Sequence, residues 1–311
     1  MTNPLYDRLF GRHAGAETPF MILPDERVIT HDAFLKMAAR TAHAMAALGL
    51  VPGDRLAVQI GKTPEALAVH AACAQAGVIF LPLNMAYTGA EIDYFVENSG
   101  AKLVLCDEKK RAGLTDVAQR NGARLETLNA DGSGSFTDLA RGLPEVYPTV
   151  ARSEDDLAAF LYTSGTTGRS KGAMLTQGNL LNNAEVLAAH WRFTNEDVLL
   201  HQLPIFHTHG LFVATNVCLV AGCAMRFYPG FDAEALIRDM PKATALMGVP
   251  TFYTRLLDDA RFTQDLTRGM RLFISGSAPL LAETHVEFEK RTGHRILERY
   301  GMTETNMSTS N

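Results

Sequence analysis

The sequence has few cysteines, no excess of charge of one sign and no long hydrophobic run. Its four cysteines are scattered over 311 residues, which excludes a disulfide scaffold and predicts reduced thiols in a cytoplasmic protein. With 29 basic and 34 acidic residues and no basic tract, nucleic acid is not an expected partner. No stretch of about 18 apolar residues occurs, so no membrane span is expected. Residues 1–4 show no basic region followed by an apolar run, so no signal peptide is expected.

What the sequence does contain is enough apolar surface for a large core. Apolar residues make up 47% and charged residues 20%, and the length predicts two domains or one domain with two lobes. Strand-like and helix-like segments alternate, which is typical of a parallel sheet covered by helices. The expected strands are 56–60, 78–81 and 102–106, and the expected helices are 64–76, 91–97 and 109–120.

A second set of elements follows a weaker segment at residues 129–155, which is rich in glycine, serine and proline. We interpret this segment as the connection between a first lobe, residues 1–150, and a second lobe, residues 151–311. The second lobe repeats the alternation, with strands at 157–162, 244–249 and 271–275 and helices near 180–191 and 282–291. In such folds ligands bind at the carboxyl ends of the strands.

The loop at residues 163–172 is the most informative stretch, with three glycines, five hydroxyls and two cations in ten residues. Glycines let the backbone approach a ligand closely, and backbone N–H groups and hydroxyls donate to phosphate oxygens. Lys171 adds a positive charge for a β- or γ-phosphate. The spacing excludes a Walker A motif, because Ser170 stands where that motif needs the glycine before its lysine. A flexible linker is the alternative, but it does not require this pair of cations.

Residues 162–172 resemble the signature of the adenylate-forming enzymes, which include acyl-CoA synthetases, luciferases and peptide-synthetase adenylation domains. Two further stretches, 203–210 and 300–304, resemble the family's central motif and its Tyr-Gly-x-Thr-Glu motif, in the family's order. The resemblance covers the whole chain but only the larger N-terminal part of the family architecture. It implies a two-lobed α/β domain with parallel-rich sheets flanked by helices, and ATP, Mg²⁺ and CoA as cofactors.

The family reaction implies roles for individual residues. A carboxylate attacks the α-phosphorus of ATP to give an acyl-adenylate and pyrophosphate, and the CoA thiolate then displaces AMP. By the resemblance, Thr303 contacts the α-phosphate, Glu304 binds Mg²⁺ and Tyr300 packs on adenine. The phosphate-binding residues are Thr163, Ser164, Gly165, Thr166, Thr167, Gly168 and Lys171. The remaining nucleotide-binding residues are Ser275, Gly276, Ser277, Ala278, Pro279, Glu298, Arg299, Gly301 and Met302.

Two histidines in the central motif have different expected roles. By the resemblance, His207 borders the acyl pocket and contacts the reacting carboxylate or the adenylate, and it joins Lys171, Thr303 and Glu304 as a catalytic residue. His209 is expected to be structural. A zinc site is disfavoured because no third ligand stands nearby at metal-binding spacing.

Two stretches, residues 248–255 and 297–307, resemble malonyl-CoA synthetases and indicate which acid is activated. By that resemblance, Arg255, Ser277 and Arg299 hold the distal carboxylate of malonate, since a guanidinium can bind a carboxylate through two parallel hydrogen bonds. Methylmalonate stays open as a second substrate. A structural ion pair stays open as an alternative role for each arginine.

The chain ends at Asn311, a few residues after Glu304. The resemblance places a smaller C-terminal lobe, with a catalytic lysine, beyond this point, and we therefore expect little turnover from these 311 residues alone. One alternative function is an adenylation domain that passes an acid to a carrier protein, for which Asp232 would be the amino-group ligand. Another is a non-catalytic nucleotide-binding lobe. No oligomeric state is predicted.

Overall fold

The computed structural model describes residues 2–163 and 169–311, which form two compact units. The first unit holds residues 1–17 and 31–182, and the second holds residues 18–30 and 183–311. The boundary expected at residue 150 differs from this division. The reason is that strands β7 (Leu157–Thr163) and β8 (Lys171–Thr176) pair with the first sheet, so the glycine–hydroxyl loop belongs to the first unit.

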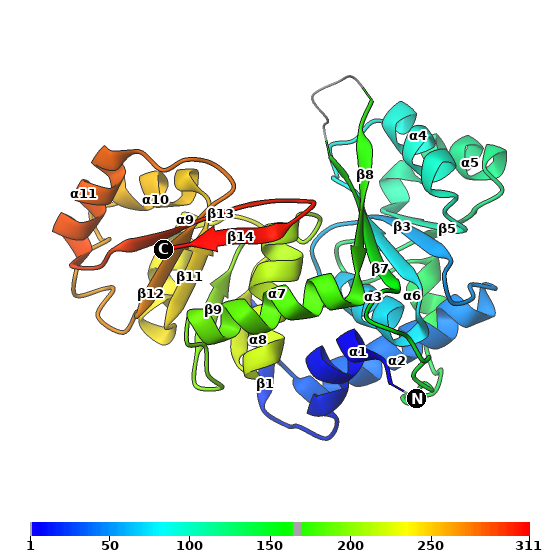
Figure 1. Ribbon diagram of the computed structural model, residues 1–311, viewed down its shortest axis with the longest axis horizontal. Coiled ribbons are helices and arrows are strands. Elements are labelled where there is room, and N and C mark those ends of the chain that lie inside the picture. The colour runs from blue at the N-terminus through cyan, green and yellow to red at the C-terminus, as the bar shows by residue number, and fades with distance from the viewer. Residues whose placement is uncertain (1, 164–168) are drawn as a thin grey trace. The chain divides into compact units, whose positions relative to one another are not determined.

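The first unit is built on a six-stranded sheet in the order β6-β5-β3-β4-β7-β8. All neighbouring strands are parallel except β7 and β8, which form an antiparallel hairpin (Figure 1). The other four strands are β3 (Arg55–Gln59), β4 (Ile79–Pro82), β5 (Leu103–Cys106) and β6 (Arg124–Thr127).

Local signals in the sequence explain the helices between these strands. Helix α3 (Pro64–Ala76) starts at the N-cap Thr63 with proline in its first turn, and it ends at Gly77 in the left-handed conformation, φ 68°. Helix α4 (Gly89–Ser99) starts with a capping box between Thr88 and Glu91. Helix α5 (Glu108–Arg120) follows β5, and apolar side chains of α4 and α5 share one core cluster with β3, β4 and β5.

The remaining helices of the first unit are α1 (Pro4–Leu9), η1 (Gly11–His13), α2 (His31–Ala47) and α6 (Ser135–Ala140). Helix α2 packs against α3 and α6. Residues 129–155, which we expected to connect two lobes, therefore include a helix packed within the first unit. Gly142 lies in an exposed turn after that helix, and Pro144 and Pro148 lie in the exposed irregular chain that follows it.

The second unit has an eight-stranded sheet in the order β14-β13-β12-β11-β9-β10-β1-β2. The last two strands of this order, β1 (Pro19–Ile22) and the edge strand β2 (Val28–Thr30), come from far earlier in the chain, and β1 pairs in parallel with β10. The other strands are β9 (Val198–His201), β10 (Ala224–Phe227), β11 (Ala245–Gly248), β12 (Leu272–Ser275), β13 (Ile296–Met302) and β14 (Asn306–Ser310).

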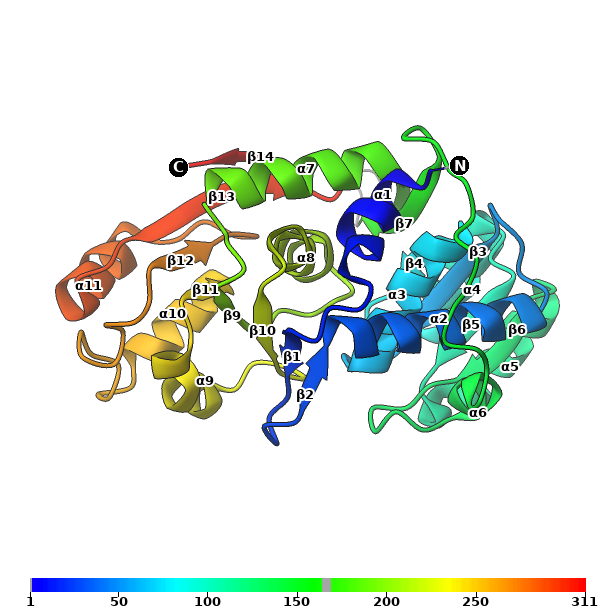
Figure 2. The ribbon, with the colours of Figure 1, turned by 90° about the horizontal axis from the view of Figure 1, so that it is seen from below.

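Helices cover both faces of this second sheet (Figure 2). The core cluster on one face is made by α9 (Ala233–Asp239), α10 (Pro250–Leu257) and α11 (Ala282–Thr292), together with strands β9, β11 and β12. The π-helix η2 (His209–Thr215) and α8 (Asn216–Ala221) follow β9, and the short η3 (Met240–Lys242) follows α9. Helix α7 (Gln177–His190) precedes β9.

The four cysteines are buried and free, as expected for reduced thiols. Of the helices in the described residues, none is both long and apolar enough to cross a membrane. The mixed α/β class with parallel-rich sheets, expected from the alternation of elements, is confirmed.

Candidate active site

A cavity of about 450 Å³ lies in the second unit, where the ends of several strands meet. Its walls come from the segment after β9, the start of η2, the loop after β12 and the turn between β13 and β14. It is lined by Leu203, Pro204, His207, Thr208, His209, Gly210, Val249, Ser277, Arg299, Gly301, Met302, Thr303 and Met307. Four of the residues expected to bind or transform substrate therefore meet here: His207, Ser277, Arg299 and Thr303.

Arg299 is the buried charge of this cavity. The side chain comes from β13, and the residue is only 6% exposed. No carboxylate lies within ion-pair distance of it among the described residues, and its Nε has no hydrogen-bond partner there. Burial lowers the pKa of Arg299 to about 10, so the guanidinium is still charged at neutral pH. A buried cation without a counter-ion is unfavourable unless an anion binds beside it.

Gly276 makes room for this guanidinium. A Cβ atom at Gly276 would lie closer than 3.0 Å to Nε, Cζ and Nη1 of Arg299, a separation that real side chains do not adopt. The next residue, Ser277, has φ 71°, a left-handed conformation that is uncommon for serine. The turn after β12 is thus shaped so that Arg299 lies across its backbone and Ser277 reaches toward the cavity.

Ser277 links Arg299 to His209 through two hydrogen bonds. Nη2 of Arg299 donates to Oγ of Ser277 at 3.3 Å, and Oγ lies 3.3 Å from Nδ1 of His209. Because Oγ already accepts from the guanidinium, we assign its own proton to Nδ1, which leaves the proton of neutral His209 on Nε2. Nε2 has no partner among the described residues, so the cavity wall holds a second unused donor.

The protonation state of His209 follows from its surroundings. Burial, the charge of Arg299 and the neighbouring His201 and His207 together hold the pKa of His209 well below its usual range. His209 is therefore neutral at pH 7. Sequence reasoning assigned this residue a structural role and missed its place on the cavity wall. The spacing of two residues between His207 and His209 is the sequence signal that could have indicated that His209 lies on the cavity wall.

The segment that carries these histidines is fixed by a tight local fold. Nε2 of His201, at the end of β9, is 2.9 Å from the carbonyl oxygen of Gly210 and 3.1 Å from Oγ1 of Thr215. A Cβ at Gly210 would lie closer than 3.0 Å to the carbonyl oxygen of Pro204, so only glycine fits there. His207 stands on the intervening turn, exposed on its outer face and packed on Phe206, with its pKa lowered by burial.

The motif at residues 300–304 forms the turn between β13 and β14. Gly301 lines the cavity, and a Cβ there would collide with the carbonyl oxygen of Asn306, a residue with φ 53°. Thr303 lines the cavity, whereas Glu304 is exposed and makes no ion pair with any described residue. Tyr300 is 59% exposed, and its ring is free to pack on a planar group.

The other residues expected on the nucleotide side lie around the end of β12. Ser275 is fully buried, and its Oγ has no partner in the described part of the chain. Glu298 accepts hydrogen bonds from the backbone N–H of Leu280 and from Nε2 of His285, at 3.3 and 2.9 Å. It thereby holds the loop in which Ala278 and Pro279 are exposed.

Arg255 and Asp232 lie outside the cavity lining. Arg255 is exposed on α10, with its guanidinium carbon 5.2 Å from the ring centre of Phe231. The structure thus does not bring Arg255 together with Arg299 on this cavity wall. The side chain of Asp232 caps α9 by accepting from the N–H of Ala235 at 3.1 Å. Because Asp232 has this structural role, it does not support the alternative of an adenylation domain in which Asp232 binds an amino group.

The glycine–hydroxyl loop lies in the first unit, between β7 and β8. Ser164, Gly165, Thr166, Thr167 and Gly168 lie outside the described residues. At the two ends of the loop, Thr163 and Lys171 face each other across the hairpin, and Lys171 is exposed.

A tyrosine on α4 supports the end of this loop. The guanidinium carbon of Arg169 lies 5.2 Å from the ring centre of Tyr94, and the Tyr94 hydroxyl donates to the carbonyl oxygen of Ser170 at 2.9 Å. In the described residues, no group of three or more His, Cys, Asp and Glu could hold a metal ion by itself.

The family model for "AMP-binding enzyme" matches residues 11–311. The chain belongs to the AMP-binding enzyme family. Among its curated relatives, the mitochondrial malonate–CoA ligase of Mus musculus is 36% identical over 252 residues, which is 76% of this chain and 42% of the relative. The malonate–CoA ligase of Arabidopsis thaliana is 30% identical over 288 residues, 85% of this chain and 47% of the relative.

Solved structures agree with the family and with the fold. Apo MatB from Rhodopseudomonas palustris superposes with a TM-score of 0.97 at 51% identity, over 100% of this chain and 62% of that protein. A structure of ATP-bound MatB from the same organism gives a TM-score of 0.97 at 52% identity, with the same coverage. The chain thus spans under half the length of these two curated relatives and about three fifths of MatB.

Proposed function

We propose that this chain is the larger part of an ATP-dependent acid–CoA ligase that activates malonate. The reaction joins the malonate carboxylate to the α-phosphorus of ATP with loss of pyrophosphate, and CoA then takes the malonyl group with release of AMP. Two malonate–CoA ligases among the relatives support the substrate class, and the ATP-bound MatB structure supports the nucleotide.

The observation that carries the choice of acid is the buried guanidinium of Arg299, which has no carboxylate partner among the described residues. A monocarboxylic acid presents its only charge to ATP and would leave this cation unpaired. A dicarboxylic acid presents one carboxylate to ATP and the other to Arg299. The Nε2–H of His209 adds a neutral donor on the same wall, and Ser277 holds the guanidinium and the imidazole in position. We place the distal carboxylate of malonate, or of methylmalonate, in this corner.

The other residues act by positioning charged groups rather than by moving protons. His207, on the wall of the same cavity, contacts the reacting carboxylate. Thr303 contacts the α-phosphate, and Tyr300 packs on adenine with Ser275, Gly276, Ala278, Pro279 and Met302 around it. Lys171 neutralises the β- and γ-phosphates, helped by Thr163 and by residues 164–168. Arg255 stays a candidate for the substrate entrance.

Glu304 fits the Mg²⁺ that phosphoryl chemistry requires. Mg²⁺ is commonly held by one or two carboxylates together with substrate phosphates. Glu304 is exposed and free of any ion pair with the described residues, which leaves its carboxylate available. A bound Mg²⁺ would neutralise charge on the phosphates, and Glu304 would fix its position. The cytoplasmic location expected from the sequence stays a prediction.

A thermal-shift titration with two non-hydrolysable adenylate analogues, malonyl and acetyl, tests the proposal without requiring turnover. Near 100 times Kd, a bound analogue should stabilise the chain by about 2.7 kcal/mol, a rise in Tm on the order of 5 °C. We expect the malonyl shift to exceed the acetyl shift. In Arg299→Met the malonyl advantage should disappear, and Arg268→Met, at an exposed arginine outside the cavity, serves as the matched control. Equal shifts for both analogues in the unmodified chain would contradict the assignment of a dicarboxylic acid.

A further inference from the structure

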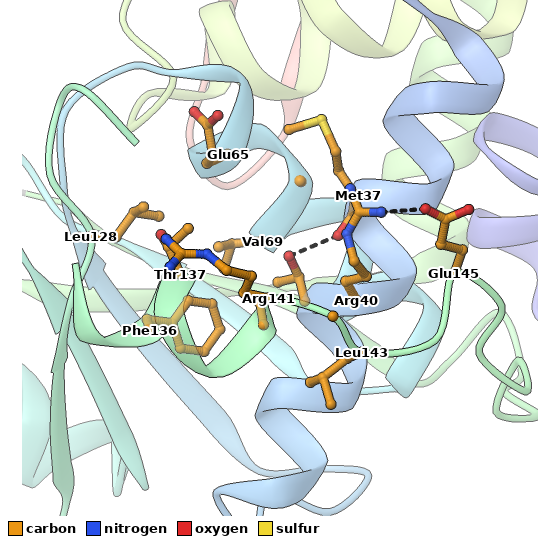
Figure 3. A pocket seen from close by; sticks show the side chains of 14 residues that line it. Met37, Arg40, Glu65, Val69, Leu128, Phe136, Thr137, Arg141, Leu143 and Glu145 are labelled. Atoms are coloured by element: carbon orange, nitrogen blue, oxygen red, sulfur yellow. Dashed lines mark hydrogen bonds and ion pairs between the residues drawn. The ribbon is translucent and has the colours of Figure 1, made fainter. Parts of the chain in front are cut away.

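The first unit contains a second cavity, of about 500 Å³, that the proposed function does not use (Figure 3). Its walls are α2, α3, α6 and the segment at residues 141–145, all within the first unit. A hollow of this size lies within the range of small-molecule sites and exceeds a packing defect in a close-packed protein.

The floor of this cavity is apolar. Val69 of α3, Leu128 after β6 and Phe136 of α6 form it, and each is no more than 2% exposed. Met37 and Leu143 continue the apolar surface toward the mouth. The floor therefore suits an aromatic ring or a branched aliphatic group.

The wall formed by α6 is held in place by hydrogen bonds at its first residue. Oγ of Ser135 donates to Oε2 of Glu126 at 2.5 Å and accepts from the N–H of Thr127 at 2.9 Å. The N–H of Ser135 donates back to Oγ1 of Thr127 at 3.1 Å. Gly134 has φ 136°, and a Cβ there would collide with the carbonyl oxygen of Thr127. The cavity is thus preformed by its own backbone.

Charged side chains line the mouth, and one of them is uncompensated. Arg40 pairs with Glu145 at 2.6 Å, and Arg141 pairs with the neighbouring Asp138 at 2.9 Å. Glu65, in the first turn of α3, has no ion pair with any described residue and lies across the cavity from Glu145 (Figure 3). The four charged residues of the lining balance in number, but Arg141 is paired with Asp138 outside the lining, which leaves Glu65 without a partner above the apolar floor.

We propose that this cavity binds a small amphipathic amine, with its ammonium group on Glu65 and its apolar body on Val69, Leu128 and Phe136. A carboxylate over an apolar floor favours a cation with a hydrophobic body, because both groups leave water for a complementary partner. An anion of the same shape would meet the uncompensated Glu65. The inference is independent of the proposed function, since the cavity shares no residue with the cavity around Arg299.

Three compounds of nearly the same shape test this site: 2-phenylethylamine, 3-phenylpropanoate and 2-phenylethanol. Binding to the whole chain is measured by calorimetry and by ligand-observed NMR. We expect saturable binding of the amine, at least about tenfold tighter than that of the alcohol, and no saturable binding of the anion.

Two variants locate the bound amine. Glu65→Gln should weaken amine binding about tenfold or more, while Glu283→Gln, which alters another first-turn glutamate on α11, should leave it unchanged. Ala140→Trp should fill the cavity and abolish binding, with its folding checked by thermal unfolding. If Ala140→Trp does not fold, the comparison of Glu65→Gln with Glu283→Gln still tests whether the amine binds at Glu65.

Three results would overturn the assignment. One is that the anion binds as tightly as the amine. Another is that Glu65→Gln and Glu283→Gln bind the amine equally well. The third is the absence of saturable amine binding up to about 10 mM.

Discussion

The guanidinium of Arg299 lies directly over the backbone of Gly276, where a Cβ atom can stand only if the guanidinium moves. A Cβ at this position would come closer than 3.0 Å to three guanidinium atoms. The glycine and the arginine are therefore one structural feature, although they are 23 residues apart in sequence.

Gly276→Ala should displace the guanidinium and weaken binding of the malonyl-adenylate analogue. A displaced charge-assisted hydrogen bond corresponds to about 1.5–3 kcal/mol, or roughly 10- to 100-fold in Kd. The acetyl analogue, which does not need the cation, should bind with little change. Titration calorimetry with both analogues measures the difference.

Gly269→Ala is the matched control for that experiment. Gly269 lies in the same unit, and a Cβ there would meet only backbone oxygens at 3.8 and 3.9 Å, which is ordinary contact. Gly269→Ala should bind both analogues as the unmodified chain does. A Gly276→Ala chain with unchanged malonyl affinity would show that Arg299 does not hold the distal carboxylate.

Arg299→Met should stabilise the unliganded chain. The arginine is buried without a counter-ion among the described residues, so methionine removes a desolvated charge and keeps much of its volume. We expect the free energy of unfolding to rise by about 1–3 kcal/mol, measured by urea denaturation at pH 7. A loss of stability of similar size would indicate that the guanidinium has a structural partner. That result would contradict the assignment of Arg299 as an unpaired anion-binding group.

The sequence predicted the local elements well and the connections between distant segments poorly. Helix α3 was predicted with its observed ends because the N-cap Thr63, Pro64 and Gly77 mark both of them. Strands β3, β5 and β12 lay within one residue of their predicted ranges at each end. Strands β1 and β2 were missed because β1 pairs with β10, about 200 residues away, and β2 only adds to the sheet through β1. Short-range patterns carry no information on such distant pairing.

In the candidate site, too, the sequence predicted individual residues but not the contacts between distant segments. The motifs identified His207, Ser277, Arg299 and Thr303, which the fold brings to one cavity. Arg255 was grouped with Arg299 from the sequence, yet its helix carries it to the surface on Phe231. The burial of His209 and the lack of a counter-ion for Arg299 depend on packing by several elements. Neither property can be read from residue spacing.

Lys171→Met should weaken ATP binding much more than AMP binding. Lys171 is exposed at the start of β8 and has no ion pair with the described residues, so its ammonium group is available for a β- or γ-phosphate. AMP lacks both phosphates. We expect a loss of about tenfold or more for ATP and little change for AMP, measured by calorimetry. Lys290→Met, on the exposed face of α11, is the control, and equal losses for both nucleotides would contradict this role.

His209→Asn should flatten the dependence of stability on pH below about 6.5. The pKa of His209 is held well below its usual range in the folded chain, chiefly by burial, whereas the unfolded histidine protonates near pH 6.5. The unfolded state therefore binds the extra proton, and the free energy of unfolding falls as the pH falls.

One such histidine contributes a slope of up to about 1.4 kcal/mol per pH unit. His207, with a pKa also lowered by burial, and His70, lowered to about 4, act with the same sign. The variant should thus lose part of the slope and not all of it. Asparagine keeps an acceptor for the hydroxyl of Ser277, so Arg299 should stay in place. Urea denaturation of both chains between pH 8 and about pH 5 measures the slopes. Parallel curves would mean that His209 is protonated in the folded state and that its Nδ1 does not accept from Ser277.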